Sequence, residues 1–97
     1  MHLYAILRQG DIMFLHIGGE FMVFVKDIVA IIDMERSTIS QDTRNFLKTS
    51  EEEGFIVNVE ENELPKSIII TQSKYSNKVY LSPISTSTLL KRYMKAE

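Results

Sequence analysis

The chain has 97 residues, of which 44% are hydrophobic and 25% charged, so its length and composition are those of one ordinary globular domain and exclude two. It contains no cysteine, which excludes disulfides, thiolate zinc sites and thiol nucleophiles and fits a reducing cytoplasm. The net charge of −2 is divided unevenly, because residues 1–63 hold five basic and twelve acidic side chains (−7), whereas residues 64–97 hold six basic and one acidic (+5).

Residues 1–12 precede a second methionine, Met13, and the codons available for Gln9–Met13 include CAA GGA GAT ATA ATG. That string holds a purine run typical of a ribosome-binding site just ahead of a start codon. We therefore expect translation to start at Met13 rather than Met1, with residues 1–12 an over-extended start; the alternative is an amphipathic leader. The segment lacks the basic region, apolar run and small-residue cleavage site of a secretory signal.

The segment 13–32 has the composition of β-strands. Two apolar runs, 13–17 and 21–25, are separated by Gly18-Gly19, which predicts a hairpin because glycine readily adopts the positive φ of tight turns. Residues 28–32 supply a third strand. Charged residues, among them Lys26 and Asp27, interrupt the apolar run, so it is not a transmembrane helix and we expect no membrane partner.

These three predicted strands are unusually apolar. Fourteen of the 20 residues from Met13 to Ile32 are apolar, and residues 28–32 show no polar alternation, although a strand with one face in water should alternate. Two helices are too few to cover that much apolar surface on a small sheet, and exposed apolar patches of such size are rare on monomers. We therefore expect the chain to form a homo-oligomer.

The next segment predicts an α-helix from about Ile39 to Glu53. Thr38-Ile39-Ser40-Gln41 fits a capping box, in which the threonine hydroxyl and the glutamine side chain satisfy backbone donors at a helix start. Gly54 follows as the glycine that ends the helix. We expect the sheet-facing side of the helix to carry Ile39, Thr43, Phe46 and Leu47.

The remaining elements are three strands and a helix. Residues 55–59, 67–71 and 78–82 predict strands four to six, joined by the polar segments Glu60–Pro65 and Gln72–Asn77. After Pro83, Ser85 or Ser87 caps a short C-terminal helix whose buried side we expect to hold Leu89, Leu90, Tyr93 and Met94. Residues 13–97 thus predict a single α+β domain with a small, mostly antiparallel sheet of about six strands, one central helix and one short C-terminal helix.

We find no constellation typical of catalysis. His16 is a lone histidine in a predicted strand, where a structural role is more common than ligation of a metal. The glutamates between Glu51 and Glu63 lack the alternating pattern of a calcium loop, and without cysteine a zinc site of the usual composition is excluded. Gly18-Gly19 lacks the spacing and the lysine of a phosphate-binding loop, and no glycine-flanked nucleophile surrounds the serines at 82–87. We therefore expect a binding protein without cofactor or metal, not an enzyme.

Basic side chains are concentrated in the C-terminal third of the chain. We interpret six of them as candidate DNA contacts: Lys66, Lys74, Lys78, Lys91, Arg92 and Lys26. Lysine binds phosphate as a flexible point charge, so contacts to the DNA backbone are favoured over contacts to bases. Two alternatives stay open: the oppositely charged halves neutralise each other, or the residues of the last helix only offset its dipole. Repeated around an oligomer, such a patch gains avidity.

Four ordered motifs carry a family resemblance: Met13–Gly18, Lys26–Ile31, Pro65–Thr71 and Leu81–Arg92. With these motifs the chain resembles the bacterial extracellular-matrix regulators of the RemA/RemB family, and within it the RemB-like branch, from Met13 almost to the end. The resemblance implies a compact α+β subunit that assembles into rings. In the RemA branch such rings bind DNA and activate genes for biofilm matrix and osmoprotection, so it also implies a cytoplasmic transcription regulator with double-stranded DNA as partner.

The chain departs from the RemA branch at its basic positions. RemA-type proteins place a cluster of arginines before the triple-aliphatic strand, where this chain has Glu63-Leu64-Pro65-Lys66, and an arginine at the start of the third strand, where it has Asp27. At the first of these positions only Lys66 is basic, and at the second the only basic residue is Lys26, which precedes Asp27. A second interpretation therefore stays open, namely a protein-interaction module that modulates a matrix regulator without touching DNA and uses the acidic loop Glu60–Glu63 as its contact.

Overall fold

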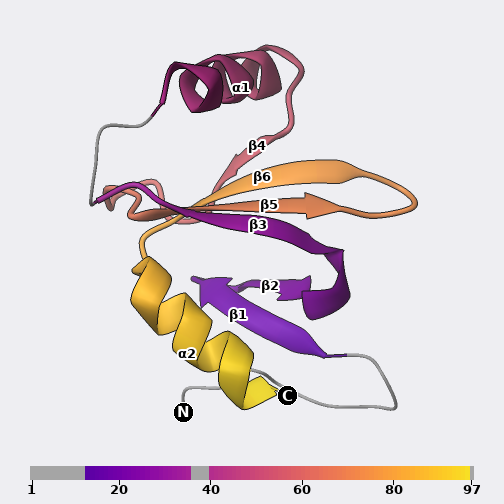
Figure 1. Ribbon diagram of the computed structural model, residues 1–97, viewed down its shortest axis with the longest axis vertical. Coiled ribbons are helices and arrows are strands. Elements are labelled where there is room, and N and C mark those ends of the chain that lie inside the picture. Colours follow the sequence, from indigo (N-terminus) through magenta and orange to yellow (C-terminus); the bar gives the residue numbers. More distant parts are fainter. Residues whose placement is uncertain (1–12, 36–39, 97) are drawn as a thin grey trace.

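The computed structural model describes residues 13–35 and 40–96, and two sheets and two α-helices make up its fold (Figure 1). In chain order the elements are β1 (Phe14–Gly18), β2 (Phe21–Phe24), the 3-10 turn η1 (Val25–Asp27), β3 (Ile28–Asp33), α1 (Gln41–Glu52), β4 (Ile56–Asn58), β5 (Ser67–Gln72), β6 (Asn77–Ser82) and α2 (Thr86–Ala96). The predicted α+β class and the order of the elements are confirmed. Residues 1–12, including the proposed over-extended start, lie outside the described residues.

The strands form two sheets instead of the single sheet that we predicted. β1 and β2 pair as a separate antiparallel hairpin, while the larger sheet has the order β3-β5-β6-β4. In that sheet β3, β5 and β6 are antiparallel, whereas β4 runs parallel to β6. The prediction of one sheet fails because η1 turns the chain between β2 and β3, so that the hairpin lies over the larger sheet and does not extend it (Figure 1).

The predicted hairpin turn is confirmed, and glycine is required in it. Gly18 and Gly19 have φ angles of 121° and 53°, in a region that residues other than glycine rarely adopt. A Cβ atom on Gly18 would also lie 3.1 Å from a methyl carbon of Val59, so the turn is packed closely against the chain that follows β4.

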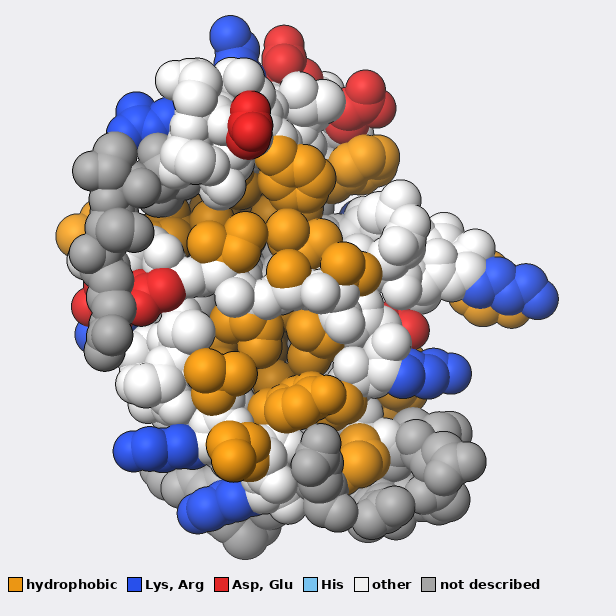
Figure 2. Space-filling view, viewed as in Figure 1, with side chains coloured by type: hydrophobic (Ala, Val, Ile, Leu, Met, Phe, Trp, Pro, Cys, Tyr) orange, Lys and Arg blue, Asp and Glu red, His pale blue; other side chains and the backbone are white. Residues whose placement is uncertain are grey.

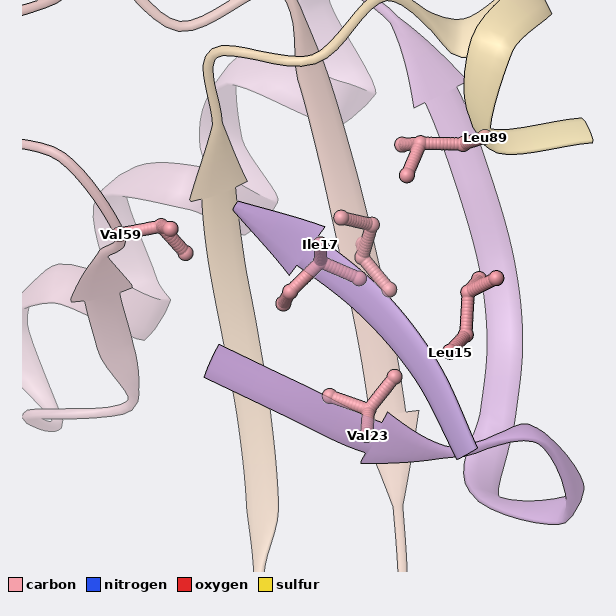
Figure 3. Packing of buried hydrophobic residues seen from close by; sticks show 6 residues of the cluster. Leu15, Ile17, Val23, Val59 and Leu89 are labelled. Carbon is pink, nitrogen blue, oxygen red and sulfur yellow. The ribbon is translucent and has the colours of Figure 1, made fainter. Parts of the chain in front are cut away.

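The core lies between the β1–β2 hairpin, α2 and one face of the larger sheet. The hairpin contributes Leu15, Ile17 and Val23, which share one face because side chains alternate along a strand. Figure 3 shows these side chains pointing toward one another and toward Leu89 of α2, with Val59 closing the cluster from the loop after β4. Ile69 of β5 packs in the same cluster. Residues far apart in the sequence thus form one contiguous core.

Two buried serines join the layers at the point where β6 leads into α2. The Ser82 hydroxyl donates to the Ile17 carbonyl at 2.6 Å and accepts from the Ile84 amide at 3.0 Å. The Ser67 hydroxyl donates to the Ile84 carbonyl at 2.7 Å and lies 2.9 Å from the Thr86 hydroxyl. Both side chains are fully buried, so these bonds replace water for backbone groups that have no access to it.

The helix α1 differs from the prediction at its start and on its packed face. Its N-cap is Ser40, whose hydroxyl accepts from the Thr43 amide at 3.1 Å, so the predicted capping box is wrong; Thr38 and Ile39 lie outside the described residues. At the other end Gly54 is confirmed as the terminating glycine, with φ 77° and a bond from its amide to the Glu51 carbonyl. Phe46 faces the sheet as expected, since it lines a groove with Ile70 and Val79, but it is 42% exposed because that groove is open.

The helix α2 also buries less than predicted. Ser85, one of the two predicted caps, accepts from the Thr88 amide at 3.3 Å. Leu89 is fully buried and Tyr93 packs against the core, as expected, but Leu90 is 46% and Met94 69% exposed, so their predicted burial is wrong. α2 packs on β1 and β3 through the side that carries Leu89, whereas Leu90 borders an open hollow beside Asp33 at the end of β3.

Candidate functional site

The structure places the six candidate DNA contacts in three separate locations. The strand register, with Ile28 opposite Thr71 and Gln72 opposite Asn77, brings Lys26, Lys74 and Lys78 to one end of the larger sheet. Lys66 stands at the opposite end of β5, and Lys91 and Arg92 lie on α2. In Figure 2 basic side chains accordingly stand apart around the outline of the molecule and form no single patch.

At the first location the ammonium groups lie over aromatic rings. Lys26 Nζ is 5.9 Å from the centre of the Phe24 ring, and Lys74 Nζ is 5.7 Å from the centre of the Tyr75 ring. Each such contact is worth about 0.5–1 kcal/mol at an exposed site, and it orders the lysine without cancelling its charge. The result is two oriented positive charges at this end of the sheet.

An acidic residue shares that end of the sheet. Asp27 and Lys78 both line a hollow of about 240 Å³, together with Tyr80. Burial, and to a lesser extent the negative charge of Asp27, raises the pKa of the Tyr80 hydroxyl above its ordinary value. Asp27 therefore lies close enough to Tyr80 to affect the pKa of its hydroxyl. Its negative charge also lowers the positive potential around Lys78.

The second location, on α2, combines two exposed lysines with an arginine that is held in place. Lys91, Arg92 and Lys95 line a shallow hollow of about 180 Å³ with Thr88. Arg92 Nη1 donates to the carbonyl of His16 at 3.3 Å and so joins α2 to β1. Lys95 was not among the six candidates, although its spacing of four residues from Lys91 places the two on the same side of a helix.

Histidine 16 has a structural role in this region. Its Nε2 lies 2.8 Å from the carbonyl oxygen of Gly19, and this hydrogen bond spans the turn of the β1–β2 hairpin. Its own carbonyl accepts from Arg92. Among the described residues no group of three or more histidine, cysteine, aspartate or glutamate side chains is arranged to hold a metal ion.

The third location places Lys66 beside the acidic loop. The Lys66 amide donates to the Ser82 carbonyl at 2.7 Å, and its carbonyl accepts from the Met34 amide at 2.9 Å, so the backbone is fixed between β3 and β6. In the preceding loop Glu61 and Glu63 are exposed, and the Leu64 side chain is 87% exposed. This end of the sheet thus presents acidic and apolar side chains next to a single lysine.

Apolar surface runs across the face shown in Figure 2, from α1 over the larger sheet to α2. A groove of about 490 Å³ between α1 and the sheet is lined by Phe46, Phe55, Ile70 and Val79, and by Val29, which is 60% exposed. The outer side of β2 adds Met22 and Phe24, and Phe21, whose ring lies 6.2 Å from that of Tyr80, is 37% exposed. The homo-oligomer was predicted because the apolar residues outnumber those that one copy can bury, and the exposed apolar surface fits that premise. The homo-oligomer itself stays a prediction.

None of the described helices is long and apolar enough to cross a membrane.

The comparison with known proteins gives two consistent matches. A family model, RemA-like, described as extracellular matrix regulatory protein A-like, matches residues 14–93. The extracellular matrix regulatory protein B of Bacillus subtilis (strain 168) is 38% identical over 80 residues, which cover 82% of this chain and 89% of that protein.

Proposed function

The chain belongs to the RemA-like family of extracellular matrix regulatory proteins, and from this premise we propose that it regulates matrix genes by binding DNA without catalysis. In this proposal a cytoplasmic homo-oligomer arrays the basic side chains of its copies along the phosphate backbone of double-stranded DNA. The contacts are Lys66, Lys74, Lys78, Lys91, Arg92 and Lys26.

The observation that carries the proposal is the way in which lysines are presented in the C-terminal third. Lys66, Lys74 and Lys91 are exposed, and each stands on a different element or at a different end of the fold. Single lysines spread in this way bind a phosphate weakly. Linked copies would present the same points repeatedly, and each further contact on one DNA is then intramolecular and gains from effective concentration.

The uncovered apolar surface supports the oligomer that this proposal requires. Phe46, Phe55 and Val29 line a groove on the α1 side of the sheet, while Leu90 and Met94 are exposed on α2. Burial of apolar surface contributes about 25 cal/mol per Å², so joining copies through such surfaces is favourable. Of the proposed DNA contacts, Lys78 also lines this groove, whereas Lys66, Lys74 and Lys91 do not.

The test is a titration of the protein against fluorescent duplex DNA at several salt concentrations. Binding through phosphates should weaken steeply with salt, with a slope of about −0.9 for each phosphate neutralised. The variant Lys91→Ala should flatten the slope by about 0.9 for every copy that touches the DNA. Lys48→Ala, which removes an exposed lysine from α1, is the matched control and should leave the slope unchanged. Absence of binding at low salt would refute the proposal.

A second candidate function rests on the loop between β4 and β5. Glu61 and Glu63 would repel a phosphate backbone. Together with the exposed Leu64 they suit a basic, partly apolar protein surface. In that case the chain modulates a matrix regulator through the loop Glu60–Glu63 without touching DNA. A protein partner that is retained by the native chain and lost when these glutamates are changed to lysine would support this alternative.

A further inference from the structure

The turn between β5 and β6 is held in a single conformation by one serine. The Ser73 hydroxyl accepts from the amides of Tyr75 and Ser76 at 3.3 and 3.1 Å and donates to the Ser76 carbonyl at 2.9 Å. The Ser73 amide donates to that same carbonyl at 2.9 Å. Figure 1 shows that this hairpin projects beyond the rest of the larger sheet. The tip is therefore preorganised and stands clear of the body of the molecule.

This ordered tip presents an aromatic and a basic side chain that the fold does not use. The Tyr75 side chain is 87% exposed, so it adds almost nothing to the core. Lys74 Nζ lies 5.7 Å from the centre of its ring, and the two side chains form one amphipathic unit. In Figure 2 this unit is seen as basic and hydrophobic side chains together at the far end of the projecting hairpin.

We propose that the β5–β6 tip enters the major groove of duplex DNA as a two-stranded arm, with the Tyr75 ring against base edges and Lys74 on a flanking phosphate. The inference rests on the proposed DNA binding and names its groove contact. A two-stranded β-ribbon fits the major groove, which is about 12 Å wide. Apolar side-chain contact with the methyl group of thymine is one of the contacts made there.

The charges near the tip favour nucleic acid over a second protein copy as its occupant. Lys74 at the tip and Lys78 and Lys26 at its base are positive, and two acids lie near the base, Asp27 in the hollow beneath and Glu53 in the groove that Lys78 also lines. Phosphates flank both sides of a DNA groove, so cations at the tip and at the base of an inserted arm both find partners. A docking site on another copy would have to supply acids at both positions.

Affinity and its salt dependence separate the roles of the two tip residues. Tyr75→Ala should weaken duplex binding by about tenfold, the effect of uncovering about 60 Å² of apolar ring surface at about 25 cal/mol per Å². It should leave the salt slope unchanged, because no phosphate contact is removed. Lys74→Ala should instead flatten the slope by about 0.9 for each copy on the DNA. Asn45→Ala is the control, because Asn45 is exposed on α1, away from the six proposed contacts, and it should bind like the native chain.

A direct readout is available because the chain contains no tryptophan. The tryptophan of Tyr75→Trp should be quenched when duplex DNA is added, whereas that of Asn45→Trp, on the exposed side of α1, should not change. Quenching on raising the protein concentration alone would place the tip in a contact between copies and overturn the inference. If the native chain binds DNA but Tyr75→Ala binds equally well, the arm is wrong and the proposed function survives. If the native chain binds no DNA, both fall.

Discussion

The buried hydroxyl of Ser82 offers the sharpest test of how the layers are held together. In Ser82→Ala the Ile17 carbonyl loses a 2.6 Å bond and the Ile84 amide loses a 3.0 Å bond, at a site where the serine is fully buried. Leaving a buried polar group unsatisfied costs about 1–3 kcal/mol. Because two groups are affected and some relaxation is expected, we predict a loss of about 2–4 kcal/mol in the free energy of unfolding.

A loss of that size is a large share of the roughly 5–15 kcal/mol by which a domain is usually stable, so it should be plain in urea unfolding. The midpoint should fall while the dependence on urea stays the same, since the core area exposed on unfolding is unchanged. All samples are compared at one protein concentration, because self-association would add concentration-dependent stability. Ser87→Ala, which removes an exposed hydroxyl in the first turn of α2, is the control and should change stability by less than about 0.5 kcal/mol. A loss below that value for Ser82→Ala would contradict the role given to its hydroxyl.

Three further predictions concern α2, α1 and Tyr80. Leu89→Ala should lower the free energy of unfolding by about 2–5 kcal/mol, because Leu89 is fully buried, whereas Leu90→Ala should lower it much less, because Leu90 is 46% exposed. Equal losses of the two variants in urea unfolding would contradict the position of α2 on the core. Gly54→Ala should cost about 1 kcal/mol by the same measurement through its φ of 77° alone, since no atom lies within 4 Å of the added Cβ, and an unchanged midpoint would argue against this helix end. Finally, the raised pKa of Tyr80 means that the unfolded chain loses this proton first, so stability should fall as pH rises above about 10; Tyr80→Phe should show a smaller fall across that range, and identical profiles would refute the assignment.

Local patterns predicted most of the elements of this fold. Gly18-Gly19 predicted the hairpin because only glycine suits both of its φ angles, and Gly54 predicted the end of α1 for the same reason. Ser85 likewise predicted the start of α2, where its hydroxyl accepts from the Thr88 amide. These features depend on neighbours in the sequence, and therefore a single sequence was enough to find them.

Features that depend on distant contacts were not predictable in this way. The separation of the hairpin from the larger sheet follows from the direction of the chain after η1, and no periodicity encodes that direction. Helical spacing grouped Leu89 with Leu90 and Met94, but only the position of α2 against β1 and β3 decides which of them is buried. At the candidate site, composition found the lysines but not their division among three locations. The bond from Arg92 to the His16 carbonyl joins residues 76 positions apart.

The central claim is that several copies of this chain bind one DNA through phosphates. The slope of log affinity against log salt concentration for the native protein and duplex DNA tests this most directly. The six candidate contacts of one copy allow a slope of at most about −5.4, so an array of copies predicts a steeper value. Absence of binding at low salt, or a slope no steeper than the roughly −5.4 that one copy could produce alone, would contradict the claim.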